Sequence, residues 1–168
     1  MKKIKYPLVG YPFTESDMSS GRKILTTKNI VTMSKVTRKF EKKFAKYLGV
    51  KYALMVNSGS SANLLAFFAL INPKSKNRLK PKSECIIPAI CWSTSLWPIV
   101  QAGLKPVFVD VNLQTFNIDI DDLKKKITKK TKAILAVHVL GNSTNMDELK
   151  KIIKKRKKTL IEDTCESL

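Results

Sequence analysis

The sequence predicts an α/β fold, a three-layer αβα sandwich with a mostly parallel sheet. Apolar segments of strand length alternate with segments of helical periodicity along most of the chain. The strand segments are apolar throughout rather than alternately apolar and polar. This pattern is typical of parallel strands covered by helices on both faces.

Composition limits the class of protein. The chain has 168 residues, 43% of them hydrophobic, enough for one domain with a core rather than a disordered chain. No apolar run reaches about 18 residues, and no apolar segment follows the charged start, so we expect neither a membrane span nor a signal peptide. Cys85, Cys91 and Cys165 form no Cys-x-x-Cys pair and His138 is the single histidine, so we expect no metal site and free thiols in the cytoplasm.

The net charge of +19 raises the question of nucleic acid. Arginine, the preferred base-reading residue, occurs only at positions 22, 38, 78 and 156. The lysines fall mainly on predicted helix faces and loops. We therefore expect only weak, non-specific and salt-sensitive binding to nucleic acid.

The first third of the chain is predicted to be an arm, a helix and a strand. Residues 1–33 lack clear periodicity and form the expected N-terminal arm, with at most one short helix. Residues 34–48 repeat apolar side chains every four positions and end before Gly49, which predicts an amphipathic helix. Residues 52–56 are an apolar run and predict a buried strand.

The segment that follows is the first candidate site. Asn57-Ser58-Gly59 predicts a turn, and a helix is predicted to begin at Ser60 or Ser61. A serine at a helix start caps free N–H groups, and such groups also bind phosphate. Taken alone, the motif fits a capped turn as well as a phosphate site.

The rest of the chain continues the alternation. Further strands are predicted at residues 84–88, 105–110, 133–140 and 159–162, and helices at 93–102, 123–127 and 147–157. Ligands of open parallel sheets bind at the carboxyl ends of the strands. Trp92, His138, Asn142, Asp163 and Glu166 fall there. Together with the serine turn they suit a planar, phosphorylated, cationic heterocycle, and pyridoxal phosphate (PLP) has those needs.

Four motifs carry a resemblance to a known family. Asn57–Asn63, Pro88–Thr94, Gly103–Asp110 and Ile161–Ser167 resemble the DegT/DnrJ/EryC1/StrS nucleotide-sugar aminotransferases, PLP enzymes of fold type I. The resemblance runs from about Tyr6 to the end of the chain and is strongest to the sugar 3-dehydratase branch. It implies that residues 34–168 are part of a PLP-binding large domain, with the C-terminal small domain absent.

The resemblance also implies a role for each candidate residue. Ser60 and Ser61 would bind the cofactor phosphate, and Trp92 would stack on the pyridine ring. Asp163 would hold the ring nitrogen protonated, and Glu166 would contact the cofactor or the amino donor. From the residues alone, Trp92 also fits the core and Asp163 a helix cap. His138 fits a hydrogen-bonded histidine in the core or behind the site residues better than a catalyst.

The resemblance implies an incomplete enzyme. The family's Schiff-base lysine, or the histidine that replaces it in the dehydratases, is expected downstream of Leu168, the last residue of the sequence. We therefore expect no catalytic residue within the chain and little turnover by the chain alone. Whether this chain is an enzyme by itself stays open.

The sequence is compatible with three functions. The first is C3 dehydration of a nucleotide-linked 4-keto-6-deoxyhexose with PLP or pyridoxamine phosphate, in deoxysugar and lipopolysaccharide O-antigen biosynthesis. The second is transfer of an amino group from a donor such as glutamate to a nucleotide-linked ketosugar. The third is a non-catalytic basic module that binds nucleic acid or a partner chain. For either enzyme the resemblance implies a homodimer when complete.

Overall fold

The computed structural model describes residues 12–26, 31–32 and 34–167, in two compact units, residues 1–55 and 56–168. Residues 1–11, 27–30 and 33 of the predicted arm lie outside the described residues. The predicted division after residue 33 into an arm and a large domain stays a prediction.

The catalytic lysine or histidine is predicted to follow the end of the sequence. Leu168, downstream of which the catalytic lysine or histidine is expected, also lies outside the described residues. The described structure therefore ends at Ser167, the final residue of the last of the four motifs. The expected position of the catalytic residue beyond Leu168 stays a prediction.

The first unit contains helices α1 (Glu15–Thr26) and α2 (Lys35–Leu48). The predicted helix at 34–48 is thus confirmed, with Ser34 as its cap. Gly49 ends α2 with φ of 67°, a left-handed conformation that glycine adopts without strain. Both ends of α2 therefore follow from local sequence.

The predicted strand at residues 52–56 is wrong, because this segment is irregular. A strand requires a ladder of hydrogen bonds to a neighbouring strand. None of the described strands pairs with these residues. Instead the N–H of Met55 donates to the carboxylate of Glu41, 3.0 Å away. The predicted burial is wrong as well, because Tyr52, Leu54 and Met55 are exposed. The apolar composition of the run carried no information about a pairing partner.

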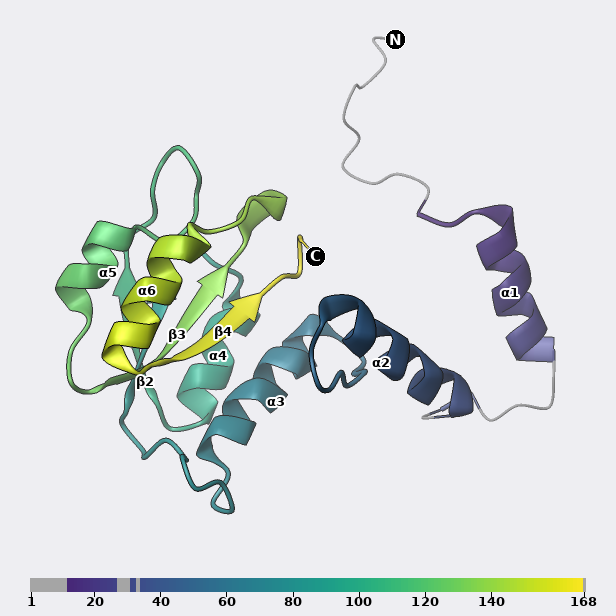
Figure 1. Ribbon diagram of the computed structural model, residues 1–168, viewed down its shortest axis with the longest axis horizontal. Coiled ribbons are helices and arrows are strands. Elements are labelled where there is room, and N and C mark those ends of the chain that lie inside the picture. Colours follow the sequence, from purple (N-terminus) through teal and green to yellow (C-terminus); the bar gives the residue numbers. More distant parts are fainter. Residues whose placement is uncertain (1–11, 27–30, 33, 168) are drawn as a thin grey trace, which may run out of the picture. The chain divides into compact units, whose positions relative to one another are not determined.

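The second unit is built on a parallel sheet (Figure 1). Its strand order is β2-β1-β3-β4. The strands are β1 (Glu84–Pro88), β2 (Lys105–Val109), β3 (Thr131–Val137) and β4 (Thr159–Asp163). Each lies within a few residues of its prediction. Two differences from the predicted strand ends matter for the site. His138 lies beyond the end of β3, and Asp163 belongs to β4.

Helices cover both faces of this sheet. They are α3 (Gly59–Ile71), α4 (Ser93–Gln101), α5 (Ile120–Lys126) and α6 (Met146–Arg156), with a short 3-10 turn, η1, at Val139–Gly141. Cys85 and Ile87 of β1 pack against Phe67 of α3 and Ile99 of α4. The alternate residue Ile86 packs in a second core with α5 and α6. The predicted three-layer sandwich is confirmed.

Helix α3 is apolar on all sides, which alone would indicate a fully buried helix. The structure buries its Asn63 and Phe67 but leaves Leu64, Leu65 and Phe68 exposed. Among the described residues no helix combines the length and the apolar character needed to cross a membrane.

Candidate functional site

A pocket of about 540 Å³ lies at the carboxyl edge of the sheet. Its walls come from the segments that follow β1, β3 and β4 and from the start of α3. Of the residues predicted for the site, Ser60, Trp92, Asp163 and Glu166 line it. The topology thus gathers side chains up to about a hundred positions apart in sequence.

The start of α3 offers free backbone donors to this pocket. Ser58 is the cap, and its Oγ accepts the N–H of Ser61 at 3.2 Å. The N–H groups of Gly59 and Ser60 have no acceptor among the described residues. Such unpaired donors at the positive end of a helix dipole bind anions.

The predicted start of this helix is corrected, because α3 begins at Gly59 rather than at Ser60 or Ser61. The correction separates the two predicted phosphate ligands. Ser60 lines the main pocket, whereas Ser61 lines only an adjoining cavity of about 280 Å³ that Ser60 also borders.

Asp163 is held rigidly at the end of β4. Its Oδ2 accepts hydrogen bonds from Asn63 Nδ2 and Ser95 Oγ, each at 2.9 Å. Its Oδ1 accepts the N–H of Cys165 at 3.2 Å. Ser95 is only 1% exposed. The carboxylate therefore caps no helix, and its orientation is set by donors from α3, α4 and its own strand end.

Trp92 stands at the N-terminus of α4 with 76% of its surface exposed. The alternative that it belongs to the core is therefore wrong. A flat aromatic ring on the pocket wall is suited to stack on a planar ligand.

His138 does not line the pocket, and it is 5% exposed. The N–H of Thr144 donates to its Nδ1 at 3.1 Å, and its Nε2 lies 3.2 Å from Glu162 Oε2. Since a backbone N–H can only donate, Nδ1 must accept, which leaves the proton on Nε2, facing Glu162. The backbone N–H of His138 also donates to the carbonyl of Asp163 at 3.1 Å. His138 thereby joins the ends of β3 and β4.

The rim of the pocket is a strained turn closed by Glu166, whose carboxylate accepts the N–H of Leu140. Leu140 has φ of 53° and Gly141 has φ of 78°. A Cβ at Gly141 would lie 3.1 Å from the Glu166 carbonyl oxygen, a tight contact, and the positive φ favours glycine at this position.

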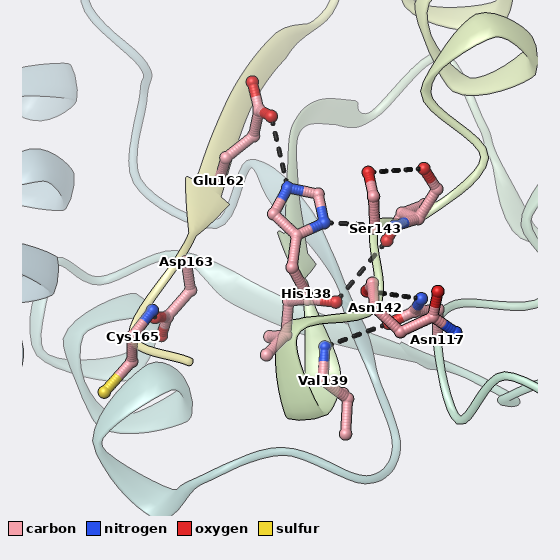
Figure 2. A network of polar contacts seen from close by, with 10 residues as sticks. Asn117, His138, Val139, Asn142, Ser143, Glu162, Asp163 and Cys165 are labelled. Carbon is pink, nitrogen blue, oxygen red and sulfur yellow. Dashed lines mark hydrogen bonds and ion pairs between the residues drawn. The ribbon is translucent and has the colours of Figure 1, made fainter. Parts of the chain in front are cut away.

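The turn after β3 is fixed by Asn117, whose Oδ1 accepts the N–H of Val139 at 3.1 Å (Figure 2). Asn117 Nδ2 donates to the carbonyl of Asn142 at 2.9 Å. Asn142, which the sequence placed among the strand-end candidates, does not line the pocket. Its side chain points to the carbonyl of Thr115.

Two thiols also line the pocket, those of Cys91 and Cys165. Burial, together with the negative charge of Asp163, raises the pKa of Cys91 above its ordinary value. Cys91 therefore remains a protonated thiol at neutral pH and is a poor nucleophile.

Sequence reasoning missed the two side chains that hold Asp163. Asn63 carries a detectable signal, because a buried amide within an otherwise apolar helix needs a partner. Ser95 carries none, since a serine in the first turn of a helix is usual. The pocket thus combines free N–H donors, an exposed aromatic ring and an oriented carboxylate, which suits a phosphorylated ring with a protonated nitrogen.

Comparison with known proteins gives consistent results. The sequence profile of the DegT/DnrJ/EryC1/StrS aminotransferase family matches residues 13–168. GDP-4-keto-6-deoxy-D-mannose 3-dehydratase of Escherichia coli O55:H7 is 46% identical over 165 residues, which are 98% of this chain and 42% of that enzyme.

Solved structures agree with the sequence comparison. The E. coli dehydratase with bound hydrated PLP superimposes with a TM-score of 0.90 at 46% identity, over 97% of this chain and 41% of that one. A GDP-4-keto-6-deoxymannose-3-dehydratase with a trapped PLP-glutamate geminal diamine also gives 0.90 at 46% identity, over 97% and 42%. The chain thus spans less than half the length of these relatives.

Proposed function

The chain belongs to the DegT/DnrJ/EryC1/StrS aminotransferase family, and we propose that it supplies the cofactor-binding part of a sugar 3-dehydratase. The reaction would remove the C3 hydroxyl of a nucleotide-linked 4-keto-6-deoxyhexose, in deoxysugar or lipopolysaccharide biosynthesis. The observation that carries the proposal is the Asp163 carboxylate, held by Asn63 and Ser95 on the wall of a pocket that also offers free N–H donors.

The residues present fit PLP or pyridoxamine phosphate. The N–H groups of Gly59 and Ser60 would hold the phosphate, and the adjoining Ser61 hydroxyl is the weaker of the two predicted ligands because it faces the neighbouring cavity. Trp92 would stack on the ring. When bound, the cofactor supplies an electron sink at the substrate carbon.

Asp163 would keep the ring nitrogen protonated, since a fixed carboxylate facing that nitrogen favours its charged form. Asn63 and Ser95 prevent the carboxylate from turning away. His138 and Glu162 would act one step further out, fixing the strand end that carries Asp163. Glu166 would contact the cofactor or the amino donor at the rim.

The second candidate is a nucleotide-sugar aminotransferase, an activity in keeping with the aminotransferase family to which the chain belongs. The pocket does not distinguish the two reactions, because both need the same cofactor contacts. Lysine at the Schiff-base position would favour transamination and histidine would favour dehydration, and the resemblance places that position downstream of Leu168.

We further propose a nucleotide-linked ketosugar and glutamate as substrates, a homodimer as the complete assembly, and a cytoplasmic location.

The proposal is tested by binding of pyridoxamine phosphate, whose amine does not react with the many lysines. With Trp97→Phe as background, Trp92 is the one tryptophan left, and its fluorescence should change on binding. Asp163→Asn should weaken the affinity roughly tenfold, because a charge-assisted hydrogen bond is lost. Asp147→Asn, an exposed carboxylate on α6, is the matched control. Unchanged Trp92 fluorescence, or equal losses in both variants, would contradict the proposed site.

A further inference from the structure

A second cavity, of about 730 Å³, lies at the opposite, amino edge of the sheet. Its lining comes from the loop before β1, from the start of β3 and from the segment that enters β4. The cofactor pocket instead lies where these same strands end. The two cavities are therefore separate, and no group of the proposed cofactor site belongs to this one.

The amino-edge cavity is strongly cationic. Its lining includes the cations Arg78, Lys80, Lys132, Lys157 and Lys158 and no carboxylate. None of these five cations forms an ion pair among the described residues. Elsewhere on the sheet and its helices, Lys105, Lys124 and Lys126 do pair with carboxylates. Positive charge is thus concentrated in this cavity without internal compensation.

A helix dipole explains only part of this concentration. Lys157 caps the carboxyl end of α6, where cations are favoured. Arg78 and Lys80 come from the loop before β1, and Lys132 comes from β3. Three separate parts of the fold therefore direct cations to one cavity.

Two of these lysines occupy unfavourable positions, Lys157 because of its backbone conformation and Lys158 because of its burial. Lys157 ends α6 with φ of 50°, a left-handed position where glycine is the usual residue. Lys158 is half-buried, and burial together with the charges of Lys132 and Arg156 lowers its pKa. Its Nζ reaches only a backbone carbonyl, that of Thr128, at 3.4 Å. A bound anion would offset the burial of the Lys158 charge and its repulsion from Lys132 and Arg156.

We propose that this amino-edge cavity binds a small anion with adjacent phosphate groups, such as an oligophosphate or the phosphate chain of a nucleotide. Cations on three elements match a ligand whose charges are spread over several phosphates. Asn77, Ser83 and Thr159 add neutral hydrogen-bonding groups to the lining. A cavity of this size suits a compact ligand rather than an extended duplex.

The test is calorimetric titration of the full chain with sodium tripolyphosphate, and with ATP to compare a free oligophosphate with a nucleotide. Lys132→Gln with Lys158→Gln should weaken binding at least about tenfold, from the loss of two charge-assisted contacts. Lys125→Gln with Lys150→Gln removes the same charge from exposed positions on α5 and α6 and should leave the affinity within about twofold. No measurable binding, or equal losses in both double variants, would overturn the proposal.

Lys157→Gly separates binding from folding. Glycine relieves the left-handed backbone, so the melting temperature should stay or rise while tripolyphosphate affinity falls. Amide shifts in NMR spectra should map the ligand to residues 78–80, 132 and 157–159. Shifts confined to Gly59 and Ser60, or duplex RNA that binds more tightly than tripolyphosphate and is insensitive to Lys132 and Lys158, would overturn it.

Discussion

The Asp163 carboxylate is oriented in part by the Ser95 hydroxyl, which lies 2.9 Å from its Oδ2. Ser95→Ala should weaken the binding of pyridoxamine phosphate roughly tenfold, because Oδ2 loses one of its two donors and the carboxylate is held less firmly. Fluorescence titration of Trp92 measures this effect. Ser143→Ala is the matched control, since its hydroxyl donates only to the Thr144 carbonyl. Equal affinity in wild type and Ser95→Ala would show that the orientation of Asp163 does not depend on Ser95.

The three thiols should differ in reactivity with iodoacetamide. Cys165 is exposed and should react first, whereas burial raises the pKa of Cys85 to about 12 and should keep it inert. In Cys165→Ser protein, Cys91 should react slowly at neutral pH and faster as pH rises, because a raised pKa delays formation of the reactive thiolate. Mass spectrometry of each peptide follows the reaction.

Adding Asp163→Asn gives this prediction its control. Removal of the neighbouring negative charge should lower the pKa of Cys91 towards its ordinary value and speed its labelling near neutral pH. An unchanged rate would mean that burial alone protects Cys91.

At the residue scale, the sequence predicted which residues line the pocket better than which side chains form hydrogen bonds with them. Trp92, Asp163 and Glu166 follow from motifs at strand ends and Ser60 from the serine turn at a helix start, and the structure brings all four to one pocket. The partners of Asp163 are 100 and 68 positions away in the chain. Local sequence does not encode which side chains meet across such separations; the strand order does.

At the scale of an element, the start of α3 combines a structural and a binding role. Ser58→Ala should destabilise the chain by about 1 kcal/mol, because the N–H of Ser61 loses its acceptor. Ser58→Asp retains a capping oxygen and should preserve the melting temperature. The added negative charge should nevertheless weaken pyridoxamine phosphate. Equal affinity in Ser58→Asp and wild type would place the phosphate away from this helix.

The elements themselves were largely predictable, with one informative failure. Helix α2 and the strands β1 to β4 follow from periodicity and composition within a few residues. Residues 52–56 are equally apolar but form no strand. Helix α3 shows the same limit, since its uniform apolarity did not reveal that Leu64, Leu65 and Phe68 are exposed. Apolar composition indicates a tendency to be buried, whereas pairing and coverage depend on distant parts of the fold.

At the scale of the whole molecule, a net charge of +19 should oppose folding through self-repulsion. The melting temperature should therefore rise as sodium chloride increases from about 0.01 to about 0.15 M, where the screening length falls to roughly 8 Å. Calorimetry at neutral pH measures this. The Lys125→Gln and Lys150→Gln variant should show a smaller rise, and a flat or falling curve in wild type would contradict the explanation.

The strand order also sets a sequence of events for a chain emerging from the ribosome. β1, α4 and β2 emerge together and can pair first, because domains form from the N-terminal side during synthesis. β3 must then dock on the other side of β1, and β4, which carries Asp163, can add only to β3. Until β4 has docked, Asn63 and Ser95 have no carboxylate to bind, so the pocket is assembled in the last of these pairing steps.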